Sequence, residues 1–138
     1  MPITYADVLS ADIQEANLTT TGADTVNSAE FDMQNLEGTA LLGIVDRVSG
    51  TAAATIAVTH SLTSGGTFNA VPADALFTPS TGQPGTFTAL STAASEQYLG
   101  LNIQKLRRYI RVEFTGTDID HNLAIAMIGG KQYSGGIG

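Results

Sequence analysis

The sequence predicts an all-β protein, an antiparallel β-sandwich or jelly roll of seven or eight short strands with an extended N-terminal arm. Two observations lead to this fold class. Segments in which apolar and polar residues alternate recur at regular spacing, and turn signals rich in glycine separate them. With 138 residues, the chain is expected to form one domain with a core that buries roughly two-thirds of its unfolded surface.

The segment 101–114 is the stretch around which the predicted sandwich is organised. Residues 109–114 alternate with a period of two, as in a half-buried strand. The apolar face consists of Ile110, Val112 and Phe114, and the polar face of Tyr109, Arg111 and Glu113. The segment also holds four of the six basic residues, Lys105, Arg107, Arg108 and Arg111. We interpret these charges as the solvated face of a sandwich strand, because a nucleic-acid site is disfavoured in a chain of net charge −7.

Residues 1–27 are predicted to be an arm outside the core, because their apolar side chains are scattered among small and acidic ones. The segment 7–16 has only a thin apolar stripe, enough for one or two helical turns. We expect the arm to pack on another subunit. Its predicted interface residues are the apolar Ile3, Tyr5, Val8, Leu9 and Ile13 and the acidic Asp7, Asp12 and Glu15, which would face basic groups. The sandwich then spans residues 28–130, and residues 131–138 form a Gly-rich C-terminal tail.

The strands are assigned from the alternation of residues and from the turns between them. The cleanest alternation lies in residues 54–71, where Gly65 and Gly66 in the middle predict a β-hairpin. Residues 72–85 contain three of the four prolines and predict a long surface loop. The other strands are expected at 28–34, 40–48, 86–90, 97–103, 109–114 and 123–128. The last of these is apolar on both faces, which is typical of a strand that is covered on both sides.

The composition favours a protein that works by association. Only 14% of the residues are charged, against about 25% in typical soluble domains. There is no cysteine, so disulfides and thiolate metal sites are excluded. Eight acidic residues precede the first basic one, Arg47, and this acidic third of the chain favours a basic partner surface over nucleic acid. We expect neither a signal peptide nor a membrane span, since no apolar run is long enough.

The sequence contains no convincing catalytic, cofactor or metal site. His60 lies at the end of an alternating apolar face, where a structural histidine is the better interpretation. Asp118, Asp120 and His121 cluster in one predicted turn, but no further ligands follow at metal-site spacing. Neither a nucleophile elbow nor a phosphate-binding loop is present. We therefore predict that the protein is not an enzyme and binds no cofactor or metal.

Two parts of the chain carry a resemblance to a known class of proteins. Residues 59–71 turn from a strand that ends in His60 and Ser61, through two glycines, into a strand that begins at Phe68. Residues 105–112 then form a basic-aromatic-aliphatic strand. Together they resemble a pattern found in small structural proteins of tailed bacteriophages, and the similarity covers roughly residues 38–130.

This resemblance implies a capsid decoration, or cement, protein. Such a protein is a β-sandwich that binds the major capsid protein on the outside of a phage head, commonly as a homotrimer, and strengthens the lattice. It would be made in the host cytoplasm and reside on the capsid surface of the virion, without membrane or nucleic-acid partners. One alternative is a head–tail connector or tail structural protein. Another is a carbohydrate-binding module or small hydrolase, although the chain has no Trp and its four tyrosines form no obvious stacking platform.

Overall fold

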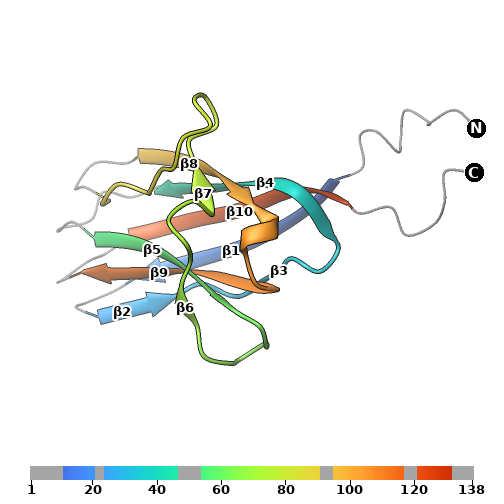
Figure 1. Cartoon of the computed structure of the whole chain (residues 1–138). Coiled ribbons are helices and arrows are strands. Elements are labelled where there is room, and N and C mark those ends of the chain that lie inside the picture. Colours follow the sequence, from blue (N-terminus) through green and yellow to red (C-terminus); the bar gives the residue numbers. More distant parts are fainter. Residues whose placement is uncertain (1–10, 21–23, 47–53, 91–94, 117–120, 132–138) are drawn as a thin grey trace, which may run out of the picture.

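The structure is a computed structural model that describes residues 11–20, 24–46, 54–90, 95–116 and 121–131. Two antiparallel sheets pack face to face as the two layers of a sandwich (Figure 1). The first sheet, in spatial order, contains β1 (Ala11–Thr20), β10 (His121–Lys131), β4 (Leu36–Asp46), β8 (Ser95–Asn102) and β7 (Leu76–Phe77). The second contains β2 (Asp24–Asn27), β9 (Tyr109–Gly116), β5 (Ala54–Ser61) and β6 (Asn69–Ala70), with β3 (Phe31–Asp32) also paired to β9. The predicted fold class is confirmed.

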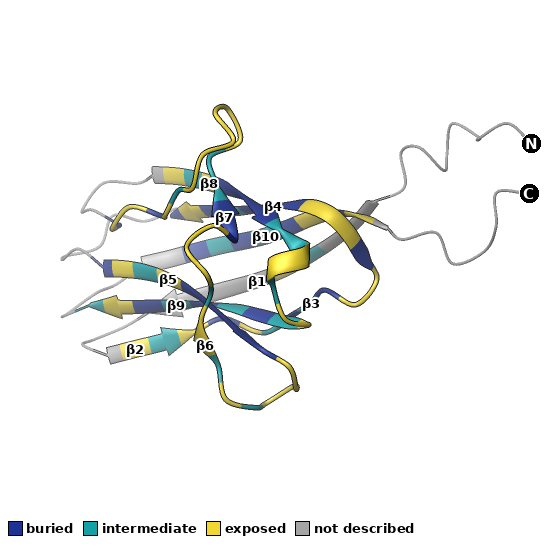
Figure 2. Ribbon diagram, in the orientation of Figure 1, coloured by how far each residue is buried: buried dark blue, intermediate teal, exposed yellow. Residues whose placement is uncertain are grey.

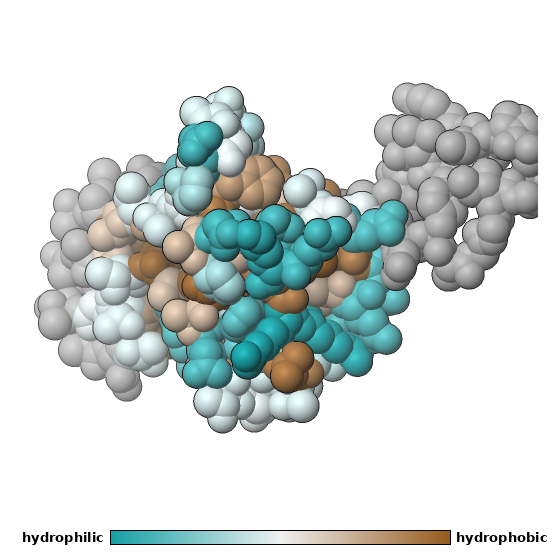
Figure 3. Space-filling view, viewed as in Figure 1, coloured by the Kyte–Doolittle hydropathy of each residue, from teal (hydrophilic) through white to brown (hydrophobic). Residues whose placement is uncertain are grey.

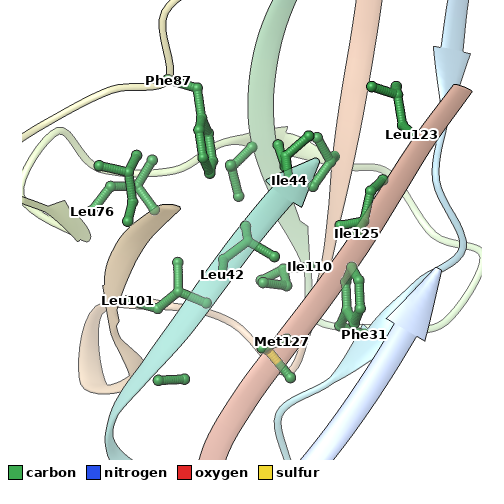
Figure 4. Close-up of a cluster of buried hydrophobic side chains, with 14 of the residues drawn as sticks. Phe31, Leu42, Ile44, Leu76, Phe87, Leu101, Ile110, Leu123, Ile125 and Met127 are labelled. Atoms are coloured by element: carbon green, nitrogen blue, oxygen red, sulfur yellow. The ribbon is translucent and has the colours of Figure 1, made fainter. Parts of the chain in front are cut away.

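The core forms because each long strand turns alternate side chains inward. Along β9, Ile110, Val112 and Phe114 are completely buried, as the alternation predicted. They face the inner residues of β4 and β10, and Figure 4 shows Ile110 close to Leu42 of β4 and Met127 of β10 in this cluster. Figure 2 shows buried and exposed residues alternating along the strands.

Two polar side chains complete the sandwich where the strand ladder is interrupted. Between β2 and β3, the hydroxyl of buried Ser28 accepts a hydrogen bond from the Val112 amide (2.9 Å), and the Ser28 amide donates to the Val112 carbonyl (2.8 Å). The Gln14 side chain in β1 accepts from the amide of Asp32 (2.9 Å) and donates to its carbonyl (2.7 Å). Gln14 thus ties an end strand of the first sheet to β3 of the second, and buried backbone groups stay paired.

The predicted boundary of the arm is wrong. Ten residues of the predicted arm form β1, which pairs with β10 from Ala11↔Gly130 to Thr20↔His121. Four more form β2, which pairs with β9. A strand at the end of a sheet needs only one covered face, so a thin apolar pattern suffices for it. The expected helical turns at 7–16 are likewise replaced by strand from Ala11 onward, while residues 1–10 and 132–138 lie outside the described part of the chain.

Two other predictions also need correction. The segment 86–90 is not a strand; it contributes only an isolated bridge between Leu90 and Ala54. The strand β10 is covered on one face only, because Leu123, Ile125 and Met127 are buried whereas Ile128 is 44% exposed. The hairpin at 54–71 is confirmed by the pairing of β5 with β6. The predicted strands at 40–48, 97–103 and 109–114 correspond to β4, β8 and β9 with shifted ends.

The loop between β5 and β6, residues 62–68, is held by several polar contacts. Gly65 has a φ of +67°, a conformation that favours glycine. The Glu30 carboxylate accepts hydrogen bonds from the Gly65 amide and the Ser64 hydroxyl, both at 2.7 Å. At the far end of the loop, the Arg111 guanidinium lies 4.2 Å from the centre of the Phe68 ring. These contacts therefore hold the loop at its tip, Gly65, and at Phe68, the residue before β6.

The core assignment predicts a large loss of stability for Phe114→Ala, about 3–5 kcal/mol in chemical denaturation, because a fully buried ring leaves a cavity. Arg111→Ala should cost about 1 kcal/mol, since its ion pair and ring contact are partly exposed. A larger loss for Arg111→Ala than for Phe114→Ala would contradict the packing described above.

The loop contacts predict a pH dependence that runs through Glu30. The hydrogen bonds from Gly65 and then Ser64 lower the pKa of Glu30 below its ordinary 4.5. A lowered carboxyl pKa means that the stabilisation is present above pH 4.5 and is lost as the pH falls through the folded-state pKa. The amide chemical shift of Gly65 should follow this titration with a midpoint below 4.5. In Glu30→Gln the titration should be absent, and a wild-type midpoint above 4.5 would contradict the contact.

Candidate functional site

The outer face of the first sheet is the most unusual surface of the described chain. Five large hydrophobic residues are exposed among the described residues, and four of them belong to strands of this sheet. These four are Leu41 and Val45 on β4, Tyr98 on β8 and Ile128 on β10, with exposed fractions from 38% for Leu41 to 61% for Tyr98. The fifth, Leu62, lies in the loop after β5. Clustered exposed apolar residues mark association surfaces more often than scattered ones do.

The strand register joins these residues into one strip. Val45 pairs with Ala124 on β10 and with Glu96 on β8. Two residues along, Gly43 pairs with Ala126 and Tyr98. Leu41 then pairs with Ile128 and Gly100. Directly paired residues point to the same side of a sheet, so these three rows form a continuous surface across β10, β4 and β8.

The middle of the strip has no side chain at Gly43 of β4, and a hollow lies at one end of the strip. A side chain added at Gly43 would meet no atom closer than 3.9 Å, so the centre of the face is open. At the Leu41 end lies a hollow of about 340 Å³. Its side-chain walls come from Thr39, Leu41, Phe77, Pro79 and Ile128.

The wall formed by Phe77 depends on a glycine. The Phe77 ring lies across Gly100, where a Cβ atom would be 2.2 Å from the ring. Only glycine permits this close approach, so the ring lies flat on the sheet and closes one side of the hollow. The face is therefore shaped by its small residues as much as by its large ones.

The outer face of the second sheet is polar instead. Thr55 and Thr115 are exposed neighbours on β5 and β9, and the Thr25 and Thr115 hydroxyls lie 3.0 Å apart. Next along β9, Glu113 and Arg111 form an ion pair of 3.1 Å. A face of threonines and paired charges is typical of a sheet that meets water. The contrast between the two faces shows that the apolar strip does not arise from β-propensity alone.

Charge on the apolar face is acidic. Glu15 on β1 pairs with Ala126, and Glu96 pairs with Val45, so one carboxylate lies on each side of the strip. Both glutamates are exposed. Among the residues of this face whose side chains are described, none is basic. A surface that covers the strip would therefore gain from basic groups near its margins.

The basic segment 105–111 is largely neutralised within the chain. Lys105 pairs with Asp74, Arg108 with Asp32 (3.0 Å) and Arg111 with Glu113 (3.1 Å). Hydrogen bonds from Arg108 and from Lys105 lower the pKa of Asp32 and of Asp74, respectively, so both carboxylates keep their charge. Figure 3 shows the hydrophilic surface over the short 3-10 helix η1 (Ile103–Lys105). The predicted solvated face fits this geometry.

His60 is a buried structural residue, as predicted. Its Nδ1 accepts a hydrogen bond from the Arg107 amide (3.1 Å), and burial, followed by the charge of Arg107, lowers the pKa of the imidazole. Within the described ranges, no three histidine or acidic side chains lie close enough together to hold a metal ion. Asp118 and Asp120 lie outside the described residues, as does the side chain of His121. No helix in the described part of the chain is long and apolar enough to cross a membrane.

The interface residues predicted from the sequence are only partly placed. Ile3, Tyr5, Asp7, Val8 and Leu9 lie outside the described residues. Asp12 and Ile13 belong to β1, but only their backbone is described, whereas Glu15 is exposed beside the apolar strip. The strip itself was not predicted. The apolar residues on both faces of segment 123–128 were interpreted as those of a strand covered on both sides, and segment 40–48 was predicted only to be a strand.

Comparison with known proteins supports the fold and goes no further. No family model matches the sequence, and no curated protein matches it significantly. Among solved structures, the chain is similar to the crystal structure of the SPBc2 prophage-derived protein YomS, with a TM-score of 0.54 and 17% sequence identity. The match covers 94% of this chain and 97% of YomS. At this identity the likeness shows that the two proteins share a fold over nearly their whole length.

Proposed function

We propose that this protein is a structural component of a bacteriophage particle, a decoration or cement protein that binds the outer surface of the capsid. The observation that carries the proposal is the apolar strip on the first sheet, opposite a polar second sheet. The fold shared with a prophage-derived protein and the resemblance of residues 59–71 and 105–112 to small phage structural proteins support the same class. The role is mechanical and non-enzymatic.

The proposed mechanism is the burial of the strip against the major capsid protein. Burial of a large apolar side chain contributes about 1.5–3 kcal/mol before the costs of association are subtracted. One strip of four partly exposed side chains gives a modest contact. A homotrimer at a symmetric site on the capsid would present three strips at once. Once one strip is bound, the other two are held near their sites at a high effective concentration, so the trimer binds more tightly than a single chain. This arrangement places the protein on the surface of the virion.

The acidic margins of the strip favour a partner surface with basic groups. Glu15 and Glu96 flank the apolar residues and are exposed. A capsid surface with apolar side chains in the middle and lysine or arginine near the edges complements this face. Such steering weakens as salt rises, because exposed charges are screened.

The test is a pair of matched lysine substitutions on opposite faces. Val45→Lys places a charge within the strip, and Thr55→Lys places the same charge on the polar face of the second sheet. In cosedimentation with empty capsids of the parent phage, Val45→Lys should weaken binding at least about tenfold, equal to about 1.4 kcal/mol. Thr55→Lys should bind within about twofold of wild type, and both variants should keep the β-type circular dichroism spectrum.

Two results would contradict the proposal. If Thr55→Lys abolishes capsid binding while Val45→Lys does not, the docking face is the second sheet. If the wild-type protein binds isolated tails or connectors and not capsids, the protein is a joining or tail component. Light scattering adds a separate readout, because a homotrimer has three times the chain mass of 14.3 kDa and a connector ring is larger.

A further inference from the structure

Leu62 is the one exposed large hydrophobic residue of the described chain that the apolar strip does not contain. It is 67% exposed, more than any residue of the strip. It follows directly after β5, in the loop 62–68, and therefore belongs to the second sheet. Figure 1 shows this loop at the bottom of the view, below β6, and β7 in the upper half of the molecule. The proposed docking face gives Leu62 no role.

The loop that carries Leu62 is already organised in the single chain. The Ser61 hydroxyl accepts a hydrogen bond from the Thr63 amide (3.2 Å) and donates to the Thr63 carbonyl (2.9 Å). The Gly66 amide donates to the same carbonyl (3.1 Å), and Glu30 binds the tip of the loop. Holding a loop in one conformation before binding reduces the entropy that association must pay. Leu62 is thus presented as a preorganised apolar knob.

The hollow beside Phe77 is an apolar receptor of suitable size. Its volume of about 340 Å³ exceeds that of a leucine side chain, and Leu41, Phe77, Pro79 and Ile128 supply apolar walls. The hollow opens on the outer face of the first sheet, whereas Leu62 projects from the second. One chain cannot insert its own knob, so a contact between the two features must join different copies.

Charge supports the same pairing. Ser61 is paired with Tyr109, so Leu62 lies beside the basic segment that precedes Tyr109. In that segment Arg107 is exposed and forms no ion pair with any described residue. The receiving face carries Glu15, which pairs with Ala126, two residues before Ile128 on β10. Pairing two receiving faces with each other would instead oppose carboxylates to carboxylates, which disfavours an isologous dimer.

We propose that Leu62 of one copy inserts into the hollow of a second copy, with Arg107 turned toward the acidic margin of the receiving face. The contact is heterologous, since each copy offers a knob on the second sheet and a hollow on the outer face of the first sheet. Three copies joined by this contact in a closed ring form the homotrimer. Because the homotrimer is part of the proposed function, the inference rests on that function. Within the trimer, the neighbouring copy therefore covers Leu41, Ile128 and Glu15, and the capsid contact proposed above narrows to Val45 and Tyr98, with Glu96 at their margin.

The test uses two variants that each remove one half of the contact. Leu62→Asp destroys the knob and leaves the hollow intact, and Ile128→Asp destroys the hollow and leaves the knob intact. By light scattering, wild type should be a closed oligomer and each variant a monomer of 14.3 kDa. An equimolar mixture of the two variants should form a dimer and nothing larger, because only one knob and one hollow remain. Thr67→Asp, an exposed change in the same loop, should keep the wild-type mass.

Several outcomes would overturn the inference. They are a monomeric wild type, single variants that keep the wild-type mass, and a mixture that stays monomeric although both variants melt like wild type. If Ile128→Asp fails to fold, Thr39→Trp fills the hollow from an exposed position and replaces it in the same experiment. A monomer that still binds capsids would refute only this contact. A ring that never binds capsids would refute only the proposed function.

Discussion

The fold depends on the packing of β9 against β4 and β10 across the space between the sheets. Ile110, Val112 and Phe114 are completely buried, and so are Leu42 and Met127 opposite them. Each sheet turns an apolar inner face toward the other, and the buried layer between them supplies the dominant stabilisation. Hydrogen bonds from Ser28 and Gln14 then keep the main chain paired where strands break off, so the core can close without unpaired amides.

The two outer faces of the sandwich meet different surroundings. The second sheet turns exposed threonines and the half-buried ion pair of Arg111 and Glu113 outward. The first sheet turns Leu41, Val45, Tyr98 and Ile128 outward, together with small residues that keep the surface nearly flat. Exposure of this strip contributes nothing to the stability of one chain. The carboxylates of Glu15 and Glu96 lie at the margins of the strip.

The small residues have a structural reason that fits association. Gly43 leaves the centre of the strip open, and Gly100 lets the Phe77 ring lie across the sheet. A large side chain at either position would project from this face. The loop 62–68 shows the opposite design, since Glu30 and Ser61 hold a single leucine away from the body of the protein. The first sheet thus carries an apolar face with a hollow at one end, and the second sheet carries a fixed, projecting leucine.

The sequence by itself determined the fold class, the hairpin at residues 54–71 and the inward face of β9, because a period of two is a local property of a strand. It also determined that His60 is structural, since its place in the alternation predicts burial. Only the tertiary structure decided that residues 11–20 belong to the sandwich. An edge strand is stabilised mainly by its neighbour, and each residue of β1 pairs with a residue of β10 that lies more than a hundred positions later in the sequence. The tertiary structure alone also decided which faces of the apolar strands are covered by the other sheet. Leu41, Val45 and Ile128 look like core residues in sequence, and they form a candidate site because no described part of the chain lies over them as a second layer.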